Sequence, residues 1–215
     1  WDRATGRARP ERDPARWSPP WPAIETIAHP RVAAKVAPAF EPPARWQGQW
    51  TSWQRTLVEA QVASWPLAQA ERRAVVLGPG VEVVIDADPT AAAVLLTDDE
   101  PLPAFLYEPD PAVARAGAVA AVAAVHGLRG LDAHSSWLAG DEPAYATPAL
   151  RGFRVVTELT GSTRDRRRAL RDLGIERVVV KSRDVSIDPA TVRRDLGVAE
   201  GGDHVLVLTR RAGRM

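Results

Sequence analysis

The stretch RVVVKSRDVSIDPATVRRDLGVAEGGDHVLVLT, residues 177–209, decides how the C-terminal part of the chain folds. It reads as a strand over 177–181, a helix over 189–196 and a second strand over 204–209. Asp188-Pro189 is a typical helix start, because an Asp side chain accepts from the first free N–H groups and Pro fits the first turn. Strands that alternate with such helices are typical of α/β folds.

The residues before this unit continue the same alternation of strand and helix. The β-branched stretch 153–159 predicts a strand, and 163–173 predicts a helix. Ser162 is the expected N-cap of that helix and Gly174 its expected end. Strands separated by helices favour a small α/β sheet that is covered by helices on at least one face.

The middle of the chain contains another strand followed by a helix. A short strand is expected over 104–107, and Asp110 followed by Pro marks a helix start. The Ala- and Val-rich segment 111–126 predicts one helix that ends at Gly127, and its apolar composition predicts that it is largely buried. A further short strand is expected over 135–139.

The first ninety residues are less regular. Residues 1–20 carry five Arg and four Pro, which predicts an irregular segment. The expected elements are a short helix over 22–29 and strands over 31–37, 49–53, 72–77 and 81–85, whereas 54–64 fits a helix and a strand about equally. Gly78-Pro79-Gly80 predicts a hairpin between the last two strands. Seven of the eight Trp lie before residue 66, so composition shifts near residue 88.

This first part reads like the back half of a nucleotide-type α/β domain, yet no strand followed by a Gly-rich turn and a helix opens it. We therefore expect the C-terminal piece of a larger enzyme. Residues 1–90 are expected to be the end of an incomplete domain, and residues 91–215 a second α/β domain. Because a neighbouring strand is absent, we expect 31–37 to form an exposed sheet edge.

Composition limits the chemistry. The net charge is +1, so no overall field attracts nucleic acid or a membrane, and the absence of Cys excludes disulfides and thiolate chemistry. The four His form no spaced set with carboxylates, so no metal is expected. The longest apolar stretch, 116–125, is too short to span a bilayer, which predicts a soluble, cytoplasmic chain. The large excess of Arg over Lys points to no function by itself.

Seven short segments occur in a characteristic order. They are Ser18-Pro19-Pro20-Trp21, Ala34-Lys35-Val36-Ala37-Pro38, Gln49-Trp50-Thr51-Ser52, Arg72-Arg73-Ala74-Val75-Val76-Leu77, Tyr107-Glu108-Pro109-Asp110-Pro111-Ala112, Lys181-Ser182-Arg183-Asp184 with Asp188-Pro189, and Leu208-Thr209-Arg210. In this order they resemble the class I S-adenosylmethionine-dependent methyltransferases that carry a THUMP-like C-terminal domain. The resemblance covers nearly the whole chain.

The resemblance implies an α/β fold: the remnant of a doubly wound, Rossmann-like methyltransferase sheet followed by a small THUMP-like α/β domain. It also implies S-adenosylmethionine as the cofactor of the full-length parent. The Gly-rich turn and the acidic residue that hold this cofactor in the family have no counterpart here. The family's Asp-Pro-Ala-Arg-Arg motif is matched only by Asp2 and Arg3, without the Pro, so no catalytic residue is assigned.

Candidate substrate or RNA contacts follow from the same resemblance. Trp21 is either a stacking platform or a core residue in a rigid connector, and the incomplete domain favours the core residue. Lys35 lies near the end of an apolar strand, where a cleft residue and a snorkelling side chain are equally plausible. Lys181, Arg183 and Arg210, together with Arg211, are expected to form a basic strip, because THUMP-type domains are associated with RNA.

Three alternatives stay open for the C-terminal domain. It binds structured RNA for a methyltransferase, it is a non-catalytic RNA- or partner-binding module, or it only stabilises the methyltransferase core. The five Arg of 163–173 fit a phosphate-binding surface, but interleaved Asp residues are more typical of a solvated helix face. Glu108 and Asp110 are interpreted as turn and capping residues rather than as a catalytic pair of carboxylates.

The cofactor expectation gives a first prediction. Because the cofactor-holding half is not represented in these residues, the 215-residue chain should not bind S-adenosylmethionine by itself. Isothermal titration calorimetry should show no saturable heat beyond that of dilution. Saturable binding with a stoichiometry near one would contradict this expectation.

Overall fold

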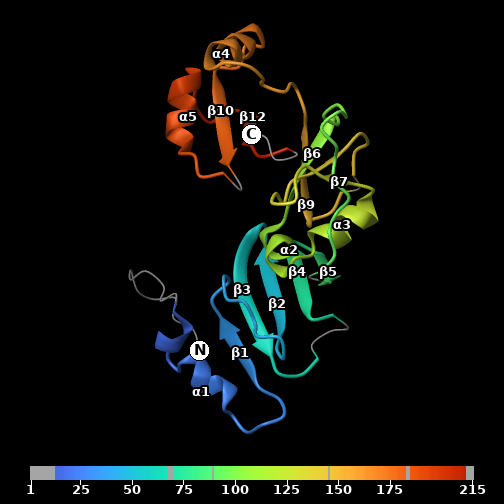
Figure 1. The fold of residues 1–215 in the computed structure, drawn as a ribbon, viewed down its shortest axis with the longest axis vertical. Coiled ribbons are helices and arrows are strands. Elements are labelled where there is room, and N and C mark those ends of the chain that lie inside the picture. Colours follow the sequence, from blue (N-terminus) through green and yellow to red (C-terminus); the bar gives the residue numbers. More distant parts are fainter. Residues whose placement is uncertain (1–12, 67–69, 89, 145, 183–184, 212–215) are drawn as a thin grey trace. The chain divides into compact units, whose positions relative to one another are not determined.

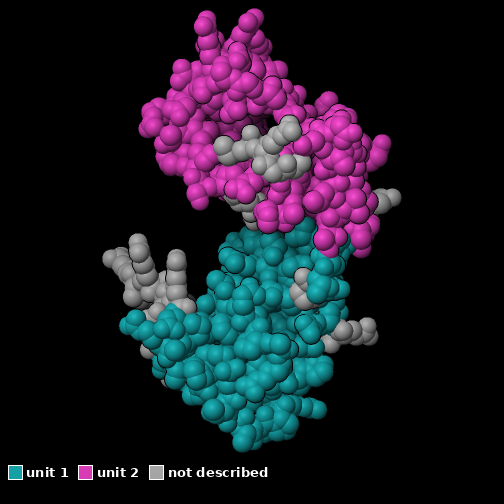
Figure 2. Space-filling model, in the orientation of Figure 1, with its two compact units in different colours: residues 1–91, 110–122, 147–149 teal, residues 92–109, 123–146, 150–215 magenta. Residues whose placement is uncertain are grey.

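A computed structural model describes residues 13–66, 70–88, 90–144, 146–182 and 185–211. The chain divides into two compact units (Figure 2). Unit 1 comprises residues 1–91, 110–122 and 147–149, and unit 2 comprises residues 92–109, 123–146 and 150–215. The expected boundary near residue 90 is therefore crossed again, because residues 110–122 return to the first unit. Each unit is described separately below.

Unit 1 is built on a five-stranded sheet with the order β1-β3-β2-β4-β5 (Figure 1). Its strands are β1 (Ala33–Val36), β2 (Gln47–Trp53), β3 (Thr56–Ala63), β4 (Arg72–Gly78) and β5 (Val81–Ala87). β3 runs antiparallel to both β1 and β2, whereas β2 and β4 are parallel. The sheet is therefore mixed, and two of its neighbouring pairs are the hairpins β2–β3 and β4–β5.

These strands confirm most of the expected elements of the first part. The undecided segment 54–64 is a strand, and Gln54 and Arg55 close its hairpin with positive φ angles of 46° and 65°. The turn at Gly78-Pro79-Gly80 joins β4 to β5 as expected. β1 lies at the edge of the sheet and pairs only with β3 among the described strands.

The core of unit 1 centres on Trp50, which is 1% exposed and donates from Nε1 to the Pro38 carbonyl at 3.1 Å. Gly48, two residues earlier on the same face, is required by this ring, because a Cβ at Gly48 would lie 2.6 Å from Trp50. Removing a buried indole of this kind costs about 3–5 kcal/mol of stability. Trp50 therefore holds β2 in place and also binds the segment that contains Pro38.

The N-terminal part of unit 1 adds an aromatic cluster. It contains η1 (Pro14–Arg16) and α1 (Trp21–Glu25). The Trp21 ring lies 4.6 Å from the Phe40 ring and 5.0 Å from the Trp46 ring, measured between centroids. All three side chains are buried, so they form a small satellite core beside the sheet.

The helix α2 (Pro111–Ala116) covers one face of the sheet over β2 and β4. Its buried side chains are Ala112, Val113 and Ala116. The single helix expected over 111–126 is wrong: Gly117 adopts a left-handed conformation with φ 72°, and its N–H bonds back to Ala114. A separate helix, α3 (Val119–His126), follows. Only part of α3 is buried, and Val125 is 81% exposed.

Both ends of α2 are fixed to the sheet by charged groups. Asp110, the N-cap, accepts from the Ala112 N–H at 2.8 Å and from the Ser52 hydroxyl at 2.5 Å. At the other end, the Arg72 guanidinium donates to the carbonyls of Ala116 at 3.0 Å and Arg115 at 2.7 Å. A negative group at the N-terminus and a positive group at the C-terminus both suit the helix dipole.

Unit 2 contains two sheets (Figure 1). The first has the order β7-β8-β6-β9 and is antiparallel, with β6 (Phe105–Pro109), β7 (Arg129–Gly130), β8 (Leu138–Gly140) and β9 (Leu150–Arg154). The second has the order β11-β10-β12 and is parallel, with β10 (Arg177–Ser182), β11 (Ala199–Glu200) and β12 (His204–Leu208). This second sheet contains the strands that the sequence predicts over 177–181 and 204–209.

Two helices accompany the parallel sheet, α4 (Thr163–Asp172) and α5 (Pro189–Leu196). Their cap residues Ser162 and Asp188 act as the sequence predicts. The core beneath them contains Leu170, Ile175, Val178 and Leu196. The α/β class and the small C-terminal α/β domain are therefore confirmed.

One strand is shorter than expected. The sequence predicts a strand over 153–159, but β9 ends at Arg154. The reason is the length of its partner: β6 begins at Phe105, and the last backbone bond is from Val155 N–H to the Ala104 carbonyl at 2.8 Å. The β-branched residues after Val155 have no strand beside them in the described part of the chain.

None of the helices in the described part of the chain has the length and apolar character that a membrane span requires.

The N-cap of α2 gives a stability prediction. Asp110→Ala should lower the free energy of unfolding by about 2–4 kcal/mol, because it removes a cap and leaves the buried Ser52 hydroxyl without an acceptor. Asp110→Asn keeps one acceptor oxygen and should lose clearly less. Urea denaturation followed by Trp fluorescence measures both. Equal midpoints for Asp110→Ala and the wild type would show that the cap contributes nothing.

Candidate functional site

A buried ion pair links the two sheets of unit 2. Both carboxylate oxygens of Glu108 accept from the Lys181 amine, at 3.0 and 2.9 Å. The Glu108 side chain is only 4% exposed and that of Lys181 is 23% exposed. The interpretation of Glu108 as a turn residue is therefore wrong, because it lies within β6 and faces a partner 73 residues further along the chain. The assignment of Asp110 as a capping residue is confirmed.

An aromatic ring lies beside this pair. The Lys181 amine is 6.0 Å from the centroid of Phe153, and the Arg151 guanidinium is 5.2 Å from the same centroid. Arg151 on β9 is also directly opposite Glu108 on β6. Lys181 is thus engaged with a buried carboxylate and a ring, and its amine is not a free cation for a phosphate.

The other members of the expected basic strip lie in different surroundings. Arg183 falls outside the described residues. Arg210 is exposed just after β12. The next residue, Arg211, instead donates to the carbonyls of Thr97, at 3.2 Å, and Glu100. Among the described members of the expected strip, Lys181 is thus paired with a carboxylate and Arg210 is exposed.

The two candidate residues of unit 1 are also engaged. Trp21 is buried in its aromatic cluster, which agrees with the core interpretation and leaves no open ring face for stacking. Lys35 on β1 is exposed and lies 3.5 Å from the carboxylate of Glu59 on β3. It therefore lies on the sheet surface rather than in a buried cleft.

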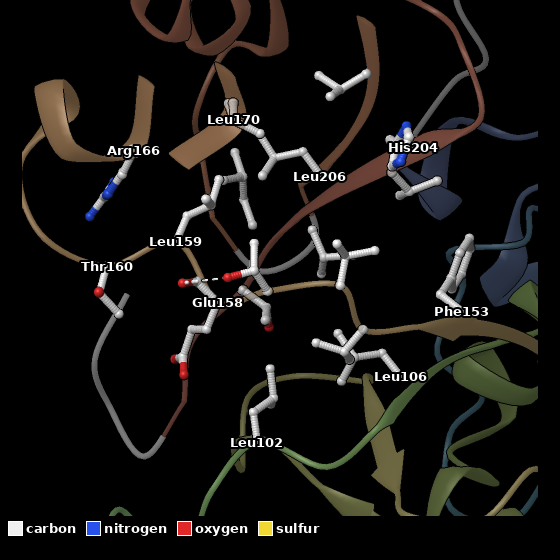
Figure 3. A pocket seen from close by; sticks show the side chains of 18 of the residues that line it. Leu102, Leu106, Phe153, Glu158, Leu159, Thr160, Arg166, Leu170, His204 and Leu206 are labelled. Carbon is white, nitrogen blue, oxygen red and sulfur yellow. Dashed lines mark hydrogen bonds between the residues drawn. The ribbon is translucent and has the colours of Figure 1, made fainter. Parts of the chain in front are cut away.

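Unit 2 contains a cavity of about 1120 Å³ that residues of both of its sheets line (Figure 3). The antiparallel sheet contributes Leu106 and Phe153 to its wall, and the segment before β6 contributes Leu102. The α/β domain contributes Leu170 and Leu206. The segment 155–161 and the strand β12 lie along the cavity, since nearly every residue of both lines it. The walls are mainly apolar, with a few charged side chains among them.

Most of those charged side chains already have partners. Glu100 is bonded to Arg129, and Arg211 lies 4.0 Å from Glu158. Arg166 on α4 is not paired in this way. No hydrogen bond or ion pair of its side chain is found in the described part of the chain, and its Nε atom is buried without an acceptor. A guanidinium in this position can bind a carboxylate or phosphate that enters the cavity.

Sequence reasoning grouped Arg166 with the other Arg residues of its helix. The helical period separates them: Arg166 lies four residues before the buried Leu170 and so shares its inward face, whereas Arg164, Arg168 and Arg171 are exposed. The four-residue spacing between Arg166 and Leu170 could therefore have predicted the inward position of Arg166. Arg167 bonds to the Asp195 carbonyl on the neighbouring helix.

The strand ends of unit 1 differ from those of a nucleotide-type sheet. In a doubly wound sheet, a nucleotide-type cofactor lies where strands end and helix N-termini begin. Within the described part of unit 1, β2 and β4 run directly into hairpins, so no such crevice forms. Among those residues no group of three or more His, Asp or Glu is placed to hold a metal ion.

A comparison with protein families gives a match for the C-terminal part of the chain. Residues 150–215 match the family described as THUMP domain-like. This part of the chain is similar to THUMP-like domains. It contains β9, the segment that follows it, the parallel sheet and both of its helices, and thus most of the wall of the cavity.

The chain is also homologous to S-adenosylmethionine-dependent methyltransferases. Two curated proteins of Mycobacterium tuberculosis, from strains CDC 1551 and H37Rv, are each described as an uncharacterized S-adenosylmethionine-dependent methyltransferase. Each is 36% identical over 139 residues, which is 65% of this chain and 36% of the relative. The chain therefore spans about a third of the length of these relatives.

A solved structure has the same fold. It is the crystal structure of a protein from Porphyromonas gingivalis W83 that is provisionally named a methyltransferase. The TM-score is 0.66 with 21% sequence identity, and the match covers 85% of this chain and 48% of the other. The likeness supports the fold of the chain over most of its length.

Glu100, beside the cavity, gives a pH prediction. Its carboxylate accepts from the Thr97 N–H at 2.7 Å, and this bond, with those from Arg129 and the Thr97 hydroxyl, lowers the pKa of Glu100 from 4.5 to about 2. The ionised group thus stabilises the fold above pH 4.5, and this contribution is lost as the pH falls towards 2. The stability difference between the wild type and Glu100→Gln should shrink over that interval.

Chemical unfolding at a series of pH values measures this difference. Asp203→Asn is the matched control, since Asp203 is exposed and has no partner in the described part of the chain. A difference between the wild type and Glu100→Gln that stays constant down to pH 2 would contradict the prediction.

Proposed function

We propose that this chain is part of an S-adenosylmethionine-dependent methyltransferase that acts on RNA, and that its THUMP-like domain contacts the RNA. The match of residues 150–215 to the THUMP-like family carries this proposal, together with the homology to methyltransferases. Methyl transfer is a displacement in which protein groups mainly align the nucleophile and the methyl donor. The cofactor would be held by residues other than those described in unit 1.

Exposed arginines of the THUMP-like domain support the RNA contact. Arg164, Arg168 and Arg171 lie on the outer side of α4, and Arg210 is exposed after β12. Arg168 shares its charge with Asp172 at 3.6 Å, in an exposed pair that contributes little. Such a surface binds phosphates through displacement of counterions, without base contacts.

The alternative is a non-catalytic module that binds RNA or a protein partner. It is favoured by the absence of a cofactor crevice in the described part of unit 1. Both proposals include a surface that binds a partner, and they differ in whether the protein transfers a methyl group. A domain that only stabilises its neighbour would show no binding at all.

Filter binding with a structured RNA across a salt series tests the RNA contact. The wild type should bind more tightly at low salt, with a steep negative slope of log K against log salt. Replacing Arg164, Arg168 and Arg171 with Gln should reduce this slope by about 2–3, because each lost phosphate contact removes about 0.7–0.9. The matched control replaces the exposed Arg31, Arg45 and Arg115 of unit 1 with Gln, which removes the same charge.

Lys181→Met separates structure from binding. It leaves Glu108 buried without a counterion and should destabilise the protein by about 3–5 kcal/mol. The salt slope of the folded variant should stay unchanged, because the Lys181 amine is already engaged. Absence of RNA retention at low salt, or an equal loss of slope in the control variant, would overturn the proposed RNA contact.

A further inference from the structure

The parallel sheet of unit 2 has an unpaired edge that faces the cavity. β12 pairs with β10 on one side only, and its other side has no backbone partner in the described part of the chain. Residues 203–209 all line the cavity. Backbone N–H and C=O groups that lie in an apolar cavity normally require hydrogen-bond partners.

A second backbone segment that lines the cavity also lacks backbone hydrogen-bond partners. The segment 156–160 makes no backbone–backbone hydrogen bond within the described residues, although its composition predicts a strand. Its residues also line the cavity, and the side chains of Glu158, Leu159 and Thr160 are among those labelled in Figure 3. Two backbone segments that line the cavity, 156–160 and the outer edge of β12, therefore each lack a neighbouring strand.

The side chains of the cavity fit an apolar occupant with one negative charge. Leu102, Leu106 and Leu206 present apolar surfaces, and Arg166 presents a guanidinium without a partner. A polyanion is disfavoured, because the carboxylates of Glu158 and Asp203 line the same space. A single carboxylate beside Arg166 gains a charge-assisted hydrogen bond without this repulsion.

We propose that the cavity binds an extended polypeptide strand, supplied from outside these 215 residues, that adds to the free edge of β12 and places a carboxylate against Arg166. Strand addition satisfies a row of backbone groups that a compact ligand cannot reach, and alternate apolar side chains fill the walls. β12 has five residues, the usual length of a strand in globular proteins. The proposal does not depend on RNA binding or on methyl transfer.

Fluorescently labelled octapeptides test this proposal directly. Three probes alternate Val and Thr and carry a single Glu in place of one Thr, at a different position in each. Matched probes carry Lys instead of Glu, or a central Pro that cannot join a ladder. At least one Glu probe should bind saturably in an anisotropy titration, and its Lys and Pro counterparts should bind more weakly.

Variants of α4 identify the site. Arg166→Gln should weaken binding of the Glu probe by about tenfold. Arg164→Gln should have no effect, because Arg164 lies two residues earlier and is exposed on another face of the helix. Circular dichroism checks that both variants fold. Bound peptide should also slow amide exchange at 156–160 and 204–208.

Three results would overturn the proposal: no saturation by any Glu probe up to about 1 mM, a level that marks only weak binding; equal binding of the Lys or Pro probes; or no effect of Arg166→Gln. A labelled single-stranded RNA provides the remaining comparison. If that RNA slows exchange at 204–208 and the peptides do not, the cavity is a nucleic-acid site instead.

Discussion

The attachment of one short helix at both of its ends holds unit 1 together. α2 has six residues, too few to be stable as an isolated helix. Asp110 connects its N-terminus to β2 through Ser52, and Arg72 connects its C-terminus to β4. The Arg72 guanidinium also lies 4.4 Å from the centroid of the Trp50 ring. The helix dipole, the buried polar bond and the main aromatic side chain therefore stabilise one another at a single place.

Unit 2 uses a buried charge for a comparable purpose. Glu108 reaches Lys181 from one sheet to the other, and a buried ion pair contributes more to specificity of arrangement than to net stability. Apolar residues alone would allow several packings of two small sheets. The pairing of the Glu108 carboxylate with the Lys181 amine selects the packing in which these two residues of β6 and β10 are in contact.

Local signals in the sequence predicted the elements well, and long-range partners escaped them. Ser162 and Asp188-Pro189 each begin a helix, as their backbone chemistry requires. Gly117 looked like a tolerated residue within one long apolar helix, because composition does not reveal which Gly takes a left-handed conformation. The pairing of Lys181 with Glu108 could not be predicted, since no local pattern relates two residues so far apart.

The candidate site shows the same limit. The inward position of Arg166 follows from its spacing to Leu170, but its lack of a partner depends on every element around it. The strand expected over 153–159 was predicted correctly in composition and wrongly in extent, because a strand also needs a neighbour. Trp21 was assigned to the core because an incomplete domain offers little for it to face, and it is buried there.

The division of the chain has a consequence for any attempt to dissect it. Residues 110–122 and 147–149 belong to unit 1, yet they are flanked on both sides by residues of unit 2. A protease cut near residue 91 would therefore not release two independent bodies, since the N-terminal fragment would leave behind the helix that covers its sheet. Grafting either unit onto another protein would require rejoining segments that evolution has kept interleaved.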